Sequence, residues 1–150
     1  LVVDALAMRF RELTLRVDLD RPKIEKLVDY RQFCKPEAPA MNSISVIELK
    51  ALLESGATDI ALVDVRTPEE AQVVSIEGSE LIPLASIESG EAIERLRDWS
   101  TSKKIFVHCK LGGRSAKAVS LLQQNGIDAV NVNGGIDAWC SEVDPALPRY

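Results

Sequence analysis

One stretch decides the fold: Ile105-Phe-Val-His-Cys109-Lys-Leu-Gly-Gly-Arg114-Ser115. Residues 105–107 have the continuous apolar pattern of a buried parallel strand, and from Ser115 onward apolar residues recur at helical spacing. Cys109 therefore falls where a strand gives way to a helix. In open α/β sheets this junction is where functional groups are placed.

The loop after this strand has the composition of a site for a thiolate. Gly112 and Gly113 permit positive φ angles, so a tight loop can point several backbone N–H groups at the sulfur of Cys109. The helix N-terminus adds the positive end of its dipole, and Lys110 and Arg114 add positive charge. In such surroundings the pKa of a thiol falls below its usual value of about 8.5.

A structural interpretation of Cys109 competes with this one. A free cysteine at the end of a core strand is frequently only a small buried apolar residue. Two glycines and two cations within five residues do not help to pack a core. The sequence therefore favours a reactive thiol.

Composition limits the classes of protein to be considered. With 150 residues, 46% of them hydrophobic, the chain can build one good core. The net charge of -5 and the few aromatic residues argue against a nucleic-acid surface. We expect no membrane span, because no apolar run reaches about 18 residues. The N-terminus lacks a signal-peptide pattern, so we expect a soluble protein.

The three cysteines, Cys34, Cys109 and Cys140, lie far apart in the sequence. Their spacing matches neither a disulfide framework nor a set of metal ligands, so we expect no metal site. Thiols that remain reduced are typical of the cytoplasm, which is the expected location.

Strand and helix patterns alternate from Ile44 onward, which predicts a small parallel sheet covered by helices on both faces. Before that point, alternation over residues 10–17 predicts a strand, and residues 1–3 a shorter one. Residues 18–42 contain three prolines and are predicted to form a tether with a short helical segment at 24–30. The expected strands of the sheet are residues 60–65, 81–82, 105–107 and 129–132. The expected helices are residues 45–55, 91–99 and those that begin at Pro68, at Ser115 and after Gly135.

Several motifs together resemble a single-domain rhodanese. They are Asp64-Val65-Arg66 with Pro68-Glu69-Glu70, the six-residue loop Cys109–Arg114, and Gly134-Gly135-Ile136-Asp137-Ala138-Trp139. The resemblance covers the chain from Ile44 onward. It implies an α/β fold with a five-stranded parallel sheet and a sulfurtransferase whose catalytic residue is Cys109.

Two earlier stretches, Asp4–Leu13 and Leu27–Cys34, are similar to the tail of the adenylating domain in MoeZ/MoeB-type adenylyltransferase/sulfurtransferases. This resemblance implies two parts: residues 1–42, a domain tail with its linker, and residues 43–150, a rhodanese-like domain. The chain contains neither a nucleotide-binding glycine loop nor a Cys-x-x-Cys zinc motif. We therefore expect no cofactor here, with ATP and zinc confined to an adenylating domain outside this chain.

The same resemblance implies a reaction and its partners. The Cys109 thiolate takes the outer sulfur of a donor, either a cysteine desulfurase persulfide or thiosulfate. Loop amides of residues 110–114 stabilise the resulting persulfide. The sulfur then passes to the activated C-terminus of a ubiquitin-like sulfur carrier, as in molybdenum cofactor biosynthesis, with the protein's own adenylating domain as a further partner.

Supporting residues leave alternatives open. Arg114 is either a pocket cation or a helix residue paired with a surface acid, and Lys110 either attracts anionic donors or simply faces solvent. Asp64 is expected to brace the loop or Arg66 through charge-assisted hydrogen bonds, without a catalytic role.

The remaining candidates are predicted to be structural. The side chain of His108 should point away from that of Cys109, which favours a hydrogen-bonded strand-end histidine over a base. Trp139 is expected to fill the core. Cys34 and Cys140 lack a cationic glycine loop, so they are expected to be resting thiols, with Cys140 as a less favoured resolving partner.

Two other classes of protein compete with a sulfurtransferase. Cysteine phosphatases with a similar strand, loop and helix place five residues between cysteine and arginine to fit a phosphate, whereas this loop has four. A non-catalytic module that only docks a carrier would be expected to lack the loop cysteine. The sequence favours sulfur transfer over both.

Overall fold

The computed structural model describes residues 2–4, 9–11 and 42–150, and the chain divides into two compact units, Leu1–Pro36 and Glu37–Tyr150. In the first unit, strand β1 (Val2–Asp4) pairs antiparallel with β2 (Arg9–Arg11). The predicted strand at 10–17 is thus observed over its first two residues. Residues 12–17 and the predicted helical segment at 24–30 lie outside the described residues.

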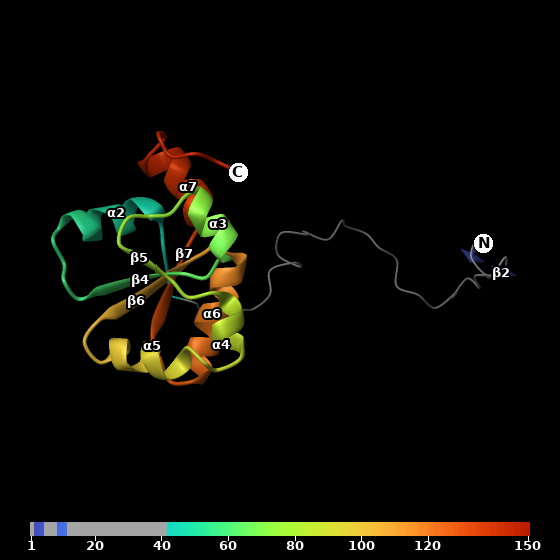
Figure 1. Ribbon diagram of the computed structural model, residues 1–150, viewed down its shortest axis with the longest axis horizontal. Helices are drawn as coiled ribbons and strands as arrows, with labels where there is room; N and C mark the ends of the chain where they lie inside the picture. Colours follow the sequence, from blue (N-terminus) through green and yellow to red (C-terminus); the bar gives the residue numbers. More distant parts are fainter. Residues whose placement is uncertain (1, 5–8, 12–41) are drawn as a thin grey trace, which may run out of the picture. The chain divides into compact units, whose positions relative to one another are not determined.

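The second unit is built on a five-stranded sheet in which every neighbouring pair of strands is parallel, as predicted. Its order is β3-β7-β6-β4-β5, so the strand that leads to Cys109 lies at the centre (Figure 1). The strands are β3 (Ser43–Ile44), β4 (Ile60–Asp64), β5 (Ser79–Leu81), β6 (Lys104–His108) and β7 (Ala129–Val132).

Helices cover both faces of the sheet, which confirms the predicted α/β class (Figure 1). Successive β6 residues alternate between two apolar clusters: Ile105 and Val107 belong to one and Phe106 to the other. The first cluster is completed by α4 (Leu84–Glu88), α5 (Ile93–Ser100) and α6 (Gly113–Gln124). The second is completed by α2 (Val46–Glu54), α7 (Gly135–Ala138) and the π-helix η1 (Trp139–Val143), and it buries Trp139 as predicted.

Two capping boxes fix where helices begin. The amide of Glu48 donates to Ser45 Oγ at 3.2 Å while the Ser45 amide donates back to the Glu48 carboxylate, which starts α2 as predicted. Thr67 and Glu70 form the same arrangement at the start of α3 (Pro68–Val73). This second box matters for function because it fixes the position of Glu70.

Some elements differ from the prediction. The strand expected at residues 81–82 is Ser79–Leu81, and Pro83 starts helix α4, which the sequence did not indicate. Strand β3 has two residues, too few to give an alternating pattern. The final helix has one α-helical turn and continues as the π-helix η1.

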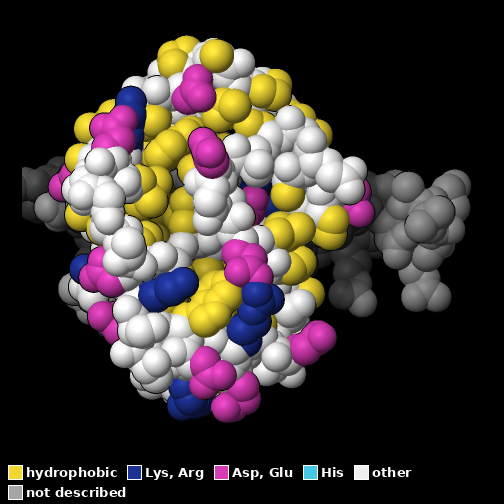
Figure 2. All heavy atoms as spheres, turned by 60° about the vertical axis from the view of Figure 1, so that its left-hand side comes forward, with side chains coloured by type: hydrophobic (Ala, Val, Ile, Leu, Met, Phe, Trp, Pro, Cys, Tyr) yellow, Lys and Arg dark blue, Asp and Glu magenta, His cyan; other side chains and the backbone are white. Residues whose placement is uncertain are grey.

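A groove of about 660 Å³ opens beside α2, the loop before β5 and η1, and its lining includes Leu53, Ile76 and Trp139. Figure 2 shows apolar side chains gathered in hollows of the molecular face turned forward, with acidic side chains between them. None of the residues Cys109–Arg114 lines this groove. Among the described residues, no helix has the length and apolar character needed to cross a membrane.

Candidate active site

Cys109 lies at the carboxyl edge of the sheet, in the four-residue connection between β6 and α6. In the parallel register Asp64, the last residue of β4, is the partner of His108, so the ends of two adjacent strands meet here. This is the edge where open α/β sheets bind ligands. The structure therefore brings the predicted loop and the predicted Asp64-Arg66 pair to one place.

The sulfur of Cys109 is buried and receives hydrogen bonds. The Gly112 amide donates to Sγ at 3.1 Å, and the Ser115 hydroxyl lies 3.4 Å from Sγ. Burial raises the pKa of the Cys109 thiol, but hydrogen bonds from the Ser115 hydroxyl and from the amides of Ser115, Gly112 and Leu111 outweigh it and lower the pKa. The thiolate is thus stabilised by hydrogen-bond donors, and the role of Ser115 was not predicted.

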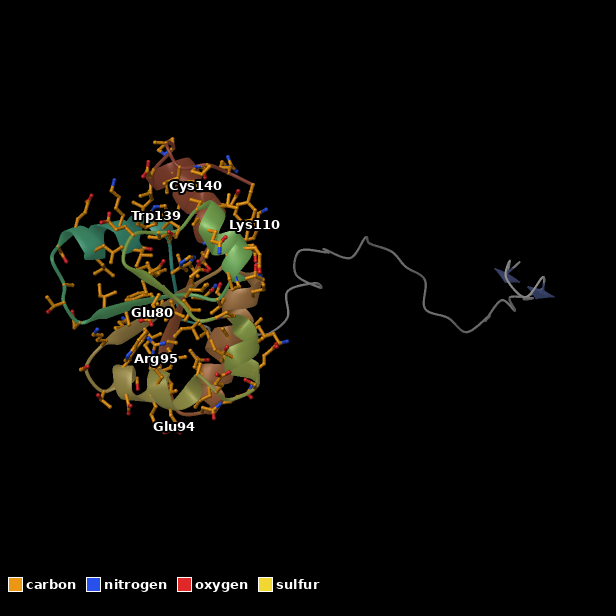
Figure 3. All side chains as sticks on the ribbon, in the orientation of Figure 1. Glu80, Glu94, Arg95, Lys110, Trp139 and Cys140 are labelled. Atoms are coloured by element: carbon orange, nitrogen blue, oxygen red, sulfur yellow. The ribbon has the colours of Figure 1, made fainter. Side chains whose placement is uncertain are left out.

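Arg114 and Lys110, the two cations of the loop, contact other side chains and do not line a pocket around Cys109. Arg114 forms a two-point ion pair with Glu70 of α3, with Nη1–Oε2 and Nη2–Oε1 distances of 2.5 and 2.7 Å. This matches the alternative in which Arg114 pairs with an acid. Lys110 lies beside α3 in Figure 3, and its Nζ is 4.1 Å from the centroid of the Tyr150 ring, a cation–π contact. Neither open interpretation of Lys110 included this contact.

The two loop glycines have different roles. Gly112 has a φ of 104° and is the N-cap of α6, so it needs the left-handed conformation that glycine supplies. Gly113 is the first residue of the helix and has no positive φ, which corrects the expectation for this residue. A Cβ at Gly113 would meet no atom within 4 Å. Leu111 is 66% exposed and contributes its backbone to the site.

Helix α7 fixes the loop backbone from the other side. The amides of Ile136 and Asp137 donate to the carbonyl oxygens of Cys109 and Lys110 at 2.9 and 3.1 Å. Gly135 has a φ of 57°, and a Cβ there would lie 2.3 Å from the Cys109 oxygen. Only glycine allows this approach, so the Gly134-Gly135 motif holds the loop carbonyls.

Asp64 braces Arg66, as predicted. The Arg66 guanidinium is fully buried, and its Nε and Nη2 donate to the Asp64 carboxylate at 2.6–3.0 Å. The remaining N–H groups donate to the carbonyl oxygens of Val74 and Glu70 and to the Tyr150 hydroxyl. All five donors of the guanidinium are therefore used.

Tyr150 joins this pair to the loop cation, a contact that the sequence did not reveal. Its hydroxyl accepts from Arg66 Nη1 and donates to Glu70 Oε1, both at 2.9 Å. The hydrogen bonds from Arg114 are the largest of the effects that lower the pKa of Glu70 to about 2. The resulting network runs from Asp64 through Arg66, Tyr150 and Glu70 to Arg114.

His108 is buried but only partly hydrogen-bonded, which corrects the expected satisfied histidine. Its Nδ1 lies 3.5 Å from the Cys109 oxygen, and its Nε2 has no hydrogen-bond partner, the nearest carboxylate being Asp64 at 3.9 Å. Burial lowers the pKa of His108 below its usual value. A neutral imidazole follows, and its side chain makes no contact that would let it act as a base on Cys109 Sγ.

The other thiols differ from Cys109. Cys140 is buried with its Sγ 3.9 Å from the Pro148 oxygen, and burial raises the pKa of its thiol. Both Cys109 and Cys140 are free, while Cys34 lies outside the described residues. Over residues 2–4, 9–11 and 42–150 no three His, Cys, Asp or Glu side chains are grouped so that they could hold a metal ion.

The parallel sheet and the strand–loop–helix around Cys109 together define a class of α/β protein. Comparison of the sequence with known families identifies that class. The rhodanese-like domain family matches residues 45–142, and the chain belongs to this family. Over its whole length the chain aligns with the probable adenylyltransferase/sulfurtransferase MoeZ of Mycobacterium tuberculosis at 41% sequence identity. The alignment covers 39% of that relative. The chain also aligns over its whole length with the adenylyltransferase and sulfurtransferase MOCS3 of Sus scrofa, at 32% identity and covering 40% of that relative. The chain thus spans about two fifths of the length of these relatives.

Solved structures agree with this assignment. A rhodanese-like domain protein of Staphylococcus aureus is 38% identical and superposes on 73% of this chain and 99% of its own, with a TM-score of 0.59. The fold of the second unit is therefore rhodanese-like.

Proposed function

We propose that the protein is a sulfurtransferase that carries sulfane sulfur as a persulfide on Cys109. The observation that carries the proposal is the hydrogen bond from the Gly112 amide to Cys109 Sγ at 3.1 Å. The Ser115 hydroxyl supports it, since it lies 3.4 Å from the same sulfur as well as 3.0 Å from the Gly112 oxygen. These donors stabilise an anionic sulfur, and the loop amides can do the same for the outer sulfur of a persulfide. Relatives named as sulfurtransferases support this reading.

The proposed transfer of sulfur from the donor to Cys109 breaks one sulfur–sulfur bond and forms another, so it needs no added oxidant or reductant. The Cys109 thiolate attacks the outer sulfur of a donor, the sulfur–sulfur bond of the donor breaks, and its electron pair leaves with the donor residue. With thiosulfate the leaving group is sulfite. With a desulfurase persulfide it is a cysteine thiolate.

The size of the loop favours sulfur over phosphate. Four residues separate Cys109 from Arg114, and Arg114 is already bound to Glu70 through both terminal nitrogens. A phosphatase would need this guanidinium for the phosphate oxygens. Sulfur transfer remains the function that the geometry supports best.

The acceptor proposed for Cys109 sulfur is a ubiquitin-like carrier protein, by similarity to MoeZ and MOCS3. The persulfide would attack the acyl-adenylate at the carrier C-terminus, releasing AMP and forming an acyl disulfide, which a second thiol then cleaves to a thiocarboxylate. We further propose that residues 1–42 are a domain tail with its linker and residues 43–150 the sulfurtransferase domain. ATP and zinc would belong to the adenylating domain.

Mass spectrometry tests the proposal directly. After incubation with thiosulfate, the peptide that contains Cys109 is expected to gain the mass of one sulfur, and Cys109→Ser is expected to lose transfer to cyanide entirely. Cys140→Ser is the matched control and should retain transfer. Sulfur found on Cys34 or Cys140 instead, or hydrolysis of aryl phosphates faster than sulfur transfer, would contradict the assignment.

A further inference from the structure

Glu70 of α3 holds the cation that closes the loop. Its carboxylate accepts four hydrogen bonds: two from Arg114, one from the Thr67 amide at 3.1 Å and one from the Tyr150 hydroxyl. The side chains of Glu70 and Arg114 are 21% and 37% exposed, so solvent only partly screens the pair. The charge of Arg114 is therefore largely balanced by Glu70.

Tyr150 fixes the direction of this carboxylate. A guanidinium can only donate, so the Tyr150 hydroxyl accepts from Arg66 and its single hydrogen goes to Glu70. Arg66 itself is immobilised by its buried pair with Asp64. The orientation of Glu70 is thus set by a chain of bonds that starts in the core.

The second cation of the loop is held by the same tyrosine. The ammonium of Lys110 lies over the Tyr150 ring at 4.1 Å from its centroid. One cation of the loop is then neutralised and the other localised on an aromatic face. Arg114 is therefore the loop cation whose charge an acid balances, while Lys110 keeps its charge.

We propose, resting on the sulfur transfer proposed above, that Glu70 is a specificity residue and that Tyr150 positions it. By neutralising Arg114, Glu70 favours sulfur donors that carry one negative charge over dianionic donors such as thiosulfate.

Two small donors that differ in charge provide the test. Thiosulfate, a dianion, gives the Cys109 persulfide and sulfite, while the methanethiosulfonate anion, with one charge, gives the same persulfide and methanesulfinate. Because the sulfur transferred is identical, the ratio of kcat/KM for thiosulfate to that for methanethiosulfonate reports on charge recognition.

Glu70→Gln is the decisive variant, since glutamine preserves the capping box and removes the charge. We expect the donor ratio to rise about threefold to fivefold through a lower KM for thiosulfate, and the rise to shrink when salt is added. Glu69→Gln is the matched control: the same change in an exposed residue of the same turn should leave the ratio unchanged. Tyr150→Phe, which keeps the ring and loses both hydroxyl contacts, is expected to raise the ratio about twofold.

Structural damage alone would lower both values of kcat/KM and leave their ratio unchanged. An unchanged ratio in Glu70→Gln would overturn the proposed role of Glu70, while sulfur transfer by the wild-type protein would still stand. A ratio that shifts in Glu70→Gln but not in folded Tyr150→Phe would remove Tyr150 from the proposal. Absence of transfer from either donor to the wild-type protein would overturn sulfur transfer itself.

Discussion

At the scale of single residues, the groups that lower the pKa of Cys109 are neutral hydrogen-bond donors. The sequence suggested that Lys110 and Arg114 lower the pKa of the thiol, but both cations are bound elsewhere, to the Tyr150 ring and to Glu70. The donors that remain are loop amides and one hydroxyl. The loop amides and the Ser115 hydroxyl together therefore lower the pKa that two charged residues were expected to lower.

Replacing Ser115 by alanine should raise the pKa of Cys109. The variant loses the hydroxyl that lies 3.4 Å from Sγ and 3.0 Å from the Gly112 oxygen, so the thiolate loses a hydrogen-bond donor while burial still opposes it. The pKa can be followed through the ultraviolet absorbance of the thiolate in a Cys34→Ser, Cys140→Ser background. Ser120→Ala, on the same helix, serves as control. An unchanged pKa in Ser115→Ala would show that the amides suffice.

At the scale of elements, helix α7 and the loop after β6 depend on one glycine. Gly135→Ala should destabilise the protein by about 2–4 kcal/mol, since a Cβ would meet the Cys109 oxygen and the residue would keep a positive φ. Gly126→Ala, at a φ of 74° with no atom within 4 Å of the new Cβ, should cost only about 1 kcal/mol. Urea denaturation measures both, and equal losses would argue against the loop contact.

The link between α3 and α6 should make stability depend on pH. Hydrogen bonds from Arg114 lower the pKa of Glu70 in the folded protein to about 2, below its usual value of 4.5, so the pair contributes stability above pH 4.5. That contribution is lost as the pH falls from 4.5 through 2. We expect Glu70→Gln to be less stable than wild type at neutral pH, with the difference vanishing toward pH 2. Thermal melts of both proteins over this range measure it, and a constant difference would contradict the assignment.

Local sequence signals account for most of the element boundaries that were predicted. The two capping boxes mark the starts of α2 and α3, and the apolar runs mark β4, β6 and β7. Helix α4 has five residues and no side-chain cap, and β3 has two residues, so neither produces a local pattern. Elements this short exist because neighbouring elements complete them, and sequence alone does not reveal them.

At the scale of the whole molecule, the site was only partly predictable. The loop residues 109–114 are consecutive, and Asp64 and Arg66 are two positions apart. Each group therefore forms a local pattern that the sequence reveals. The contacts of Glu70 with Arg114 and Tyr150 join residues 44 and 80 positions apart. No periodicity encodes such a contact, because it arises only once the sheet order is set.

Residues 42–150 should fold and react without the preceding segment. The sheet, both apolar clusters and the Cys109 loop all lie within residues 43–150. Removing residues 1–41, which keeps Asn42 and its hydrogen bond from the Asn131 amide, is expected to leave the melting temperature within a few degrees of the full chain and to preserve sulfur loading of Cys109. A large drop in the melting temperature would show that the first segment contributes to the core.

The central place of β6 has a consequence for how the chain opens. Its amides are bonded between β4 and β7 and covered by an apolar cluster on each face, whereas β5 is an edge strand. Deuterium should therefore enter Phe106 and Val107 last, at a rate set by global unfolding, and enter Ser79–Leu81 much sooner. Cys109 would then follow directly on the most slowly exchanging backbone of the unit, so local fluctuations that admit a partner would arise in the loop and not in strand β6.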